Sequence, residues 1–313
     1  MKFLVNGSIA FDLLLSHDGS FLSAIDSKNL ENLSVNYLAQ GFKRHHGGTA
    51  ANIGWNLALL GNEPLLLGAI GFDGQAYLAL LRERGILTNL VERRDDAITA
   101  TAVIATDSSE RQISFFHPGA DGLSSLPDFS DEENIAYAIM SPRNPVLMLK
   151  GAQLCSKLKI PYLFDPGQVV HAFSDDELRH AVKASAGLVV NDYEWGLASG
   201  KLGWKEADVV KACGMLVVTL GEKGLRIVTK HETLDIPACK PEKFINPTGA
   251  GDAVRAGLLI GLSAKWSLTD TGRLAAILGC LLVEQEGTLL NSLDWDMVQS
   301  RAMQNYGVKL PTI

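Results

Sequence analysis

The chain has 313 residues, of which 47% are apolar and 20% charged, with 35 acidic side chains against 28 basic ones. This length is sufficient for one large or two ordinary domains with a sizeable core. The net charge of −7 opposes broad binding to nucleic acid or to an anionic membrane surface, although a local basic pocket could still hold phosphates. The composition is typical of a soluble α/β protein.

The cysteines and the N-terminal segment indicate a cytoplasmic protein. The N-terminal apolar run over residues 2–15 is interrupted by Asn6 and Asp12, and no small-residue cleavage site follows it. No stretch reaches about 18 uninterrupted apolar residues, so no membrane-spanning helix is expected. Four cysteines are too far apart in sequence for a C-x-x-C zinc or redox motif and are interpreted as free thiols, namely Cys155, Cys213, Cys239 and Cys280.

Short apolar runs alternate with segments of helical periodicity along most of the chain. This alternation predicts strand-helix-strand units around a mainly parallel sheet, and strands that are apolar on both faces fit a buried position. In chain order we expect a strand at 3–5, helix 50–60, strand 64–69, helix 75–84, strand 136–140, helix 146–157, strand 162–164, helix 176–184, strands 187–190 and 215–220, and helices 250–262 and 271–284.

One region departs from this alternation. Residues 99–106 and 111–116 are two strand-like runs joined by a polar turn, which predicts a β-hairpin. Together with residues 13–44, the hairpin would form a small sheet that projects from the main body. Since no linker rich in Pro, Gly or Ser separates this part, we expect one domain over 1–313.

The segment 246–252 (NPTGAGD) directly precedes an apolar helix. Gly249 and Gly251 would let backbone N–H groups converge at the helix start, where the helix dipole also favours an anion. Asp252 would repel that anion unless it takes a proton from a hydroxyl that attacks a phosphoryl group. The alternative is that Asp252 only stabilises the first helical turn and the glycines only shape it.

A second glycine turn, 46–52 (HGGTAAN), also opens a helix. Gly47 and Gly48 would allow a ligand to approach the backbone, and Asn52 would present a donor and an acceptor. Alternatively, the turn is a plain loop with Thr49 as the helix N-cap. A dinucleotide motif G-x-G-x-x-G is excluded because Val254 occupies the last glycine position, and no G-x-x-x-x-G-K-[ST] phosphate loop is present.

These two turns, in this order and separation, resemble the two signatures of the ribokinase-like (PfkB) family of carbohydrate and nucleoside kinases. The resemblance extends to Asp12, to an N-x-x-E motif at Asn191 and Glu194, and to the turn 219–224. Within the family, residues 115–120, 191–195 and 247–257 are similar to the bacterial adenosine kinases. The resemblance implies a ribokinase-like α/β fold with a small β-sheet lid, formed by excursions over roughly 13–44 and 97–118.

The resemblance also implies an activity, the transfer of the γ-phosphoryl group of ATP to the 5′-hydroxyl of adenosine. Asp252 would be the general base, and the N–H groups of Gly249, Ala250 and Gly251 would form the anion hole. Glu194 would hold Mg²⁺ through water. The implied nucleotide-binding residues are Asn191, Thr219, Gly221, Gly224 and Thr248, and the implied substrate-binding residues are Ser8, Asp12, Gly47, Gly48, Asn52, Phe116 and Gln168.

Some implications of the resemblance stay open. Phe116, and with it Phe115, would either stack on the adenine base or belong to the core. Asn246 replaces a common Asp near a position associated with monovalent cations, which leaves potassium dependence undecided. Arg255 would either reach a phosphate or form a salt bridge. The lid of some family members forms a homodimer contact.

Three alternative functions are compatible with the sequence. The first is a kinase of the same family for a sugar such as ribose or fructose, and the second is a kinase for another nucleoside. The third is a binding protein for a nucleoside or sugar without catalysis, against which the presence of Asp252 argues. A nicotinamide-dependent dehydrogenase would need the glycine motif that Val254 interrupts.

Overall fold

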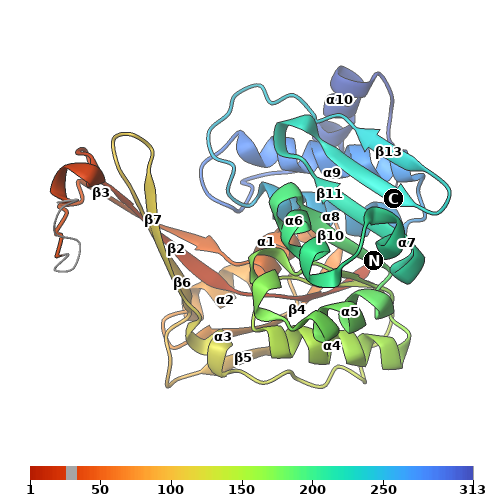
Figure 1. The fold of residues 1–313 in the computed structure, drawn as a ribbon, viewed down its shortest axis with the longest axis horizontal. Coiled ribbons are helices and arrows are strands. Elements are labelled where there is room, and N and C mark those ends of the chain that lie inside the picture. Colours follow the sequence, from red (N-terminus) through yellow and green to blue (C-terminus); the bar gives the residue numbers. More distant parts are fainter. Residues whose placement is uncertain (26–33, 313) are drawn as a thin grey trace.

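A nine-stranded sheet forms the centre of the protein in a computed structural model, which describes residues 1–25 and 34–312 (Figure 1). All neighbours from β5 to β11 are parallel, and two antiparallel strands complete one edge. The mainly parallel α/β class is confirmed. In sheet order the strands are β5 (Val91–Arg94), β4 (Glu63–Gly71), β1 (Lys2–Asn6), β8 (Ile135–Met140), β9 (Tyr162–Phe164), β10 (Gly187–Asn191), β11 (Met215–Thr219), β12 (Leu225–Thr229) and β13 (Thr233–Ile236).

Helices cover both faces of this sheet because its strands are apolar on both sides. Along β4, Leu66 and Ile70 pack into one buried cluster, while Leu65 and Leu67 pack into another. The first cluster includes side chains from α1 (Thr49–Leu59), α2 (Gln75–Glu83), α8 (Ala250–Ser263), α9 (Leu268–Val283) and α10 (Trp295–Tyr306). The second includes side chains from α4 (Pro145–Leu158), α5 (Asp175–Ala184), α6 (Asp192–Leu202) and α7 (Glu206–Cys213). Within the described ranges, no helix has the length and apolar character that crossing a membrane requires.

A separate four-stranded sheet, called the small sheet below, extends away from the main body (Figure 1). Its strands, in order, are β3 (Gly41–Gly47), β2 (Ala10–Ser16), β6 (Ala100–Thr106) and β7 (Gln112–His117). The antiparallel pairing of β6 with β7 confirms the predicted hairpin. A short helix α3 (Gly119–Leu123) follows β7, and a 3₁₀ turn η1 (Phe21–Ala24) follows β2. Residues 26–33 of the predicted excursion 13–44 lie outside the described residues.

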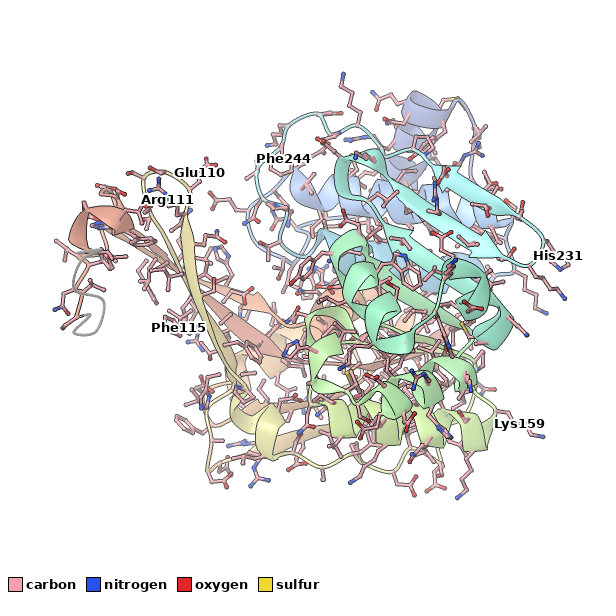
Figure 2. The ribbon with its side chains drawn as sticks, viewed as in Figure 1. Glu110, Arg111, Phe115, Lys159, His231 and Phe244 are labelled. Atoms are coloured by element: carbon pink, nitrogen blue, oxygen red, sulfur yellow. The ribbon has the colours of Figure 1, made fainter. Side chains whose placement is uncertain are left out.

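The register of the small sheet determines which side chains share a face. Asp12 lies opposite both His45 and Ala102, and Ala102 lies opposite Phe116. Residues directly opposite each other project to the same side of a sheet, so Asp12 and Phe116 share one face. Phe115, the next residue along β7, therefore lies on the other face (Figure 2). Phe115 and Phe116 are 70% and 56% exposed, so the expectation that they could belong to the core is wrong.

Candidate active site

Polar residues gather at the carboxyl ends of the parallel strands. Ser8 follows β1, Asp165 follows β9, and Asn191 and Thr219 end β10 and β11. Open α/β sheets present ligands at this edge. A cleft of about 410 Å³ lies here and brings together residues predicted from separate parts of the sequence, namely Gln168, Asn191, Glu194, Thr219, Gly221, Gly251 and Asp252.

Asp252 lies in the first turn of α8, and Asn52 of α1 contacts it. The Asn52 amide donates a hydrogen bond to Asp252 Oδ2 at 2.8 Å. Burial raises the pKa of Asp252 to about 7, whereas the Asn52 hydrogen bond and the charge of Arg255 lower it. Burial of a charged carboxylate is unfavourable, and a carboxylate that only stabilises a helix start does not require burial. A pKa near neutrality is suited to a general base.

The start of α8 has the geometry of an anion site. Gly249 is the N-cap and has a left-handed conformation with φ 85°, and a Cβ at this position would lie 2.9 Å from Leu282 Cδ2. The Ala250 N–H already donates to the Pro247 carbonyl at 3.2 Å. The Gly251 N–H lies in the first helical turn, where backbone donors have no partner within the helix, and the dipole favours an anion there.

Two glycines bring β3 and α1 close to the turn that precedes β2. Gly48 is the N-cap of α1 with φ 94°, and a Cβ there would lie 2.6 Å from the Ala10 nitrogen. A Cβ on Gly47 would lie 2.6 Å from Asp12 Oδ2. Burial raises the pKa of Asp12, and the neighbouring His45 opposes this shift. The Asp12 carboxylate, a hydrogen-bond acceptor, therefore lies beside the backbone of Gly47 and Gly48, which carry no side chains.

Ser8 has a local structural partner at the start of α1. Its hydroxyl accepts a hydrogen bond from the Thr49 N–H at 3.1 Å, and the Ser8 N–H donates to Thr49 Oγ1 at 3.2 Å. The alternative that Thr49 is the N-cap is therefore wrong, because Gly48 occupies that position and Ser8 supplies the capping oxygen. Ser8 thus orients the glycine turn, whatever contact it makes with a substrate.

Asn52 has one side-chain atom that the described residues leave unsatisfied. Its Oδ1 is buried without a hydrogen-bond partner, while its amide nitrogen is used by Asp252. Buried acceptors are rarely left alone, so this oxygen next to the base has the capacity to accept a further hydrogen bond. A substrate hydroxyl has the chemistry to supply it.

Asn191 and Glu194 form a reciprocal capping box at the start of α6. Asn191 Oδ1 accepts from the Glu194 N–H, and Glu194 Oε2 accepts from the Asn191 N–H, both at 2.8 Å. Glu194 is only 8% exposed, and burial together with the charge of Asp165 raises its pKa. Glu194 is therefore a buried carboxylate of the cleft and not a solvated charge on the helix surface.

The oxygen donors around Glu194 fit a cation whose other ligands are water molecules and substrate phosphates. Among residues 1–25 and 34–312, no group of three His, Cys, Asp or Glu side chains converges as a metal site. A buried carboxylate with a raised pKa is nevertheless stabilised by a nearby cation. Mg²⁺ keeps several waters and commonly binds through one or two carboxylates and substrate phosphates, which matches this site.

A second cavity of about 320 Å³ adjoins the cleft and shares Thr219, Gly221 and Gly251 with it. Gly224 also lines it, with φ 98°. Its remaining walls are mainly apolar and include Phe244, Val254, Ala276, Cys280 and Val283. The cavity therefore offers a mainly apolar space for a flat group, and this space is continuous with the anion site.

Some predicted residues lie outside these two cavities. The Thr248 side chain is exposed, and its N–H donates to Asn246 Oδ1 at 2.8 Å. Phe116 lies on the small sheet, on the face that also carries Asp12. Within the described chain neither residue lines the cleft or the apolar cavity.

Sequence reasoning did not find Asp165 or the apolar cavity walls on α9. Asp165 is buried at the cleft and pairs with Arg255. Its position directly after an apolar strand was a usable signal, since the strand ends of such sheets bind ligands. The apolar walls carry no such signal, because Ala276 and Cys280 resemble any core residues of a helix.

A proton acceptor beside a helix start suited to an anion, with an apolar cavity next to it, fits a phosphotransferase that acts on an alcohol. A family model described as pfkB family carbohydrate kinase matches residues 20–295. The chain therefore belongs to the pfkB family of carbohydrate kinases, which confirms the resemblance of its motifs.

Several of the similar proteins are named nucleoside kinases, and others are named ribokinase and fructokinase. The Methanothermobacter thermautotrophicus nucleoside kinase is 32% identical over 280 residues, covering 85% of this chain and 87% of that protein. The Burkholderia thailandensis nucleoside kinase in complex with inosine has a TM-score of 0.89 and 32% identity, covering 98% of this chain and 99% of that one. The same Burkholderia kinase in complex with ADP-inosine has a TM-score of 0.87 and 31% identity, covering 99% of this chain and 98% of that one.

Proposed function

We propose that this protein transfers the γ-phosphoryl group of ATP to the 5′-hydroxyl of a nucleoside, with adenosine as the preferred acceptor and AMP and ADP as products. The observation that carries the proposal is the position of Asp252, which Asn52 holds between the glycine turn of α1 and the anion site of α8. Similarity to named nucleoside kinases supports a nucleoside acceptor. The preference for adenosine rests on the motif resemblance.

On the acceptor side, Asp252 takes the proton of the 5′-hydroxyl as its oxygen attacks the phosphoryl group. Asn52 orients the carboxylate, and its unpaired Oδ1 accepts a hydrogen bond from the acceptor. Asp12 accepts hydrogen bonds from the ribose hydroxyls beside the backbone of Gly47 and Gly48. Fixed acceptors of this kind favour a substrate with paired hydroxyls, because an analogue without them leaves buried groups unpaired.

On the donor side, the adenine of ATP occupies the apolar cavity and the phosphates extend past Thr219 and Gly221 toward Gly251. The Gly251 N–H and the α8 dipole stabilise the charge on the transferring group. Glu194 and Asn191 would hold Mg²⁺ through its water ligands, and the ion would supply charge neutralisation at the phosphates.

The small sheet acts as a lid of a single domain in this proposal. Phe116 shares a face with Asp12, so the sheet that binds the ribose also presents an aromatic ring to the base. Closure excludes water and so prevents wasteful hydrolysis of ATP. The opposite face carries the exposed Phe115, and a homodimer through this sheet is tested by sedimentation of a Phe115→Ser variant, which would be monomeric.

The proposal is tested by measuring ADP release with a panel of acceptors. We expect turnover of adenosine, slower turnover of inosine and other nucleosides, and little turnover of ribose or fructose. Clear turnover of ribose with none of adenosine would overturn the proposed acceptor and favour a sugar kinase.

The non-catalytic alternative is tested with Asp252→Asn. We expect turnover to fall by orders of magnitude while calorimetry shows that adenosine still binds, since the variant lacks only the proton acceptor. A wild-type protein that binds adenosine but releases no ADP would favour the binding-protein alternative.

A further inference from the structure

Asp165 and Arg255 form a buried ion pair at the cleft. Asp165 follows β9, and Arg255 lies one turn beyond Asp252 in α8. Arg255 Nε lies 2.9 Å from Asp165 Oδ2, and Arg255 Nη2 lies 3.2 Å from Asp165 Oδ1. Asp165 is 2% exposed and Arg255 is 6% exposed. This two-point geometry locks the guanidinium in place.

The third nitrogen of Arg255 binds the backbone of its own helix. Arg255 Nη1 donates to the Gly251 carbonyl at 3.3 Å. All three guanidinium nitrogens therefore have protein partners, which favours the salt-bridged alternative for Arg255 over direct contact with a phosphate. The ion pair thus ties the end of β9 to the first turn of α8.

The contact of Arg255 with the Gly251 carbonyl is one peptide bond away from Asp252, the proposed general base. The Gly251 carbonyl and the Asp252 N–H belong to the same peptide plane, and in a trans peptide they point in opposite directions. Fixing the carbonyl therefore fixes the direction of the Asp252 N–H at the anion site. The same contact fixes the Cα position from which the Asp252 carboxylate projects.

The two charges of the pair also act on Asp252 in opposite directions. Burial raises the pKa of Asp252, the Arg255 charge lowers it, and the Asp165 charge raises it. Burial opposes the charge of Arg255, but Asp165 keeps the pKa of Arg255 above its ordinary value. The other groups that act on or feel the charge of Asp252 are Asn52 of α1, Asp12 of β2 and Tyr77 of α2.

We propose that Asp165 and Arg255 are positioning residues for phosphoryl transfer, which hold the Gly251–Asp252 peptide and the Asp252 carboxylate in the reactive geometry. This inference rests on the proposed function. Neither residue touches the reacting atoms; both act through Gly251 and Asp252.

The test compares Arg255→Met and Asp165→Asn with the wild type in full pH profiles of kcat and kcat/KM. Loss of fixed geometry predicts a fall in kcat of roughly 10- to 100-fold with small changes in KM. Arg255→Met removes the charge that lowers the pKa of Asp252, so the acid limb of kcat/KM moves to higher pH. Asp165→Asn removes the charge that raises it, so the limb moves to lower pH.

Two further variants separate positioning from general damage. Arg255→Lys keeps the positive charge but not the two-point contact, so we expect an unshifted acid limb with reduced kcat. Arg226 of β12 forms a similar two-point pair with Asp235 of β13, at 2.7 and 3.2 Å, with both side chains exposed, and Arg226→Met should retain wild-type kinetics.

The inference is overturned if folded Arg255→Met keeps the wild-type kcat, or if both partners move the acid limb in the same direction. If Arg255→Met fails to fold, Arg255→Lys and Asp165→Asn decide the question by the same criteria. A wild-type protein without any kinase activity would instead refute the proposed function, which is a distinct result.

Discussion

Replacing Asp252 by Asn should stabilise the protein while it abolishes efficient turnover. The fold disfavours the charge of Asp252, since burial raises its pKa from 3.8 to about 7. An uncharged amide of the same shape avoids that penalty. Its amide oxygen can keep the hydrogen bond that the Asn52 amide donates to Asp252 Oδ2.

The size of the gain follows from the two pKa values. Each pKa unit corresponds to about 1.4 kcal/mol, so a change from 3.8 to about 7 gives a penalty of about 4 kcal/mol on the ionised folded protein. The Asp252 side chain is partly open to the cleft. Because water there stabilises the charge, the penalty of about 4 kcal/mol is an upper value. With roughly 2 °C for each kcal/mol in a chain of this size, Tm should rise by about 5 °C or more at pH 8.

The sign of the pH dependence distinguishes this cause from general stabilisation. An acid whose pKa is higher in the folded chain retains its proton there while the unfolded chain loses it, so wild-type stability falls as pH rises from about 4 to about 7. The advantage of Asp252→Asn should therefore be smaller at pH 5 than at pH 8, by about 2.5 kcal/mol. Thermal unfolding of both proteins at these two pH values, without nucleotide, measures the difference.

The control is Asp296→Asn, which changes an exposed acid in the first turn of α10. This variant should lose a few tenths of a kcal/mol, because a negative charge near a helix start is favourable. A gain for Asp252→Asn that is equal at pH 5 and pH 8, or a loss at pH 8, would refute the claim that the fold disfavours the charge at this position.

Three further substitutions test the two sides of the site. Phe116→Ala should raise KM for adenosine about tenfold or more, since stacking of a base on an aromatic ring contributes about 1–3 kcal/mol; steady-state kinetics measures this. Glu194→Gln keeps the hydrogen bonds of the α6 cap but removes the negative charge of the side chain, so the Mg²⁺ concentration for half-maximal activity should rise roughly tenfold. Gly48→Ala should lower the free energy of unfolding by more than about 2 kcal/mol and abolish activity, since φ is 94° and Ala10 leaves no space for a Cβ.

Each of these substitutions has a matched control. Phe115→Ala changes the opposite face of β7 and should leave KM for adenosine unchanged; an equal effect of both would remove Phe116 from base recognition. Glu177→Gln alters a similar capping box at α5 and should leave the Mg²⁺ requirement as it is. Gly61 also has a positive φ, 76°, but a Cβ there would meet no neighbouring atom, so Gly61→Ala measures backbone strain alone. If it lowered the free energy of unfolding as much as Gly48→Ala, the proposed steric clash at Gly48 would be contradicted.

The layers of the fold were predictable because each depends on local patterns. Apolar runs and helical periodicity located the core strands and most helices. The start of α9 was placed three residues late, since Ser267 caps the helix through the Asp270 N–H before the apolar repeat begins. The helices α3, α6, α7 and α10 were missed because few apolar residues define their buried faces. The short strands β5, β12 and β13 were missed because few residues define them.

The site was predictable where a backbone requirement leaves a mark in the sequence. Gly48 and Gly249 need positive φ, and both were singled out as turn glycines. Contacts between distant segments leave no such mark. The Asn52–Asp252 hydrogen bond joins residues 200 positions apart, and the Asp165–Arg255 pair depends on the order of strands in the sheet. Their geometry became visible only with the fold.

Because Asp12 and Phe116 share one face of the small sheet, substrate recognition and catalysis would lie on two different parts of the protein, the small sheet and the main body. In the proposed function the small sheet contacts the sugar and the base, while α8 and the strand ends carry out the chemistry. Preference for a different base can therefore evolve, or be engineered, through β6 and β7 alone. Such changes would leave the proton acceptor and its surroundings intact.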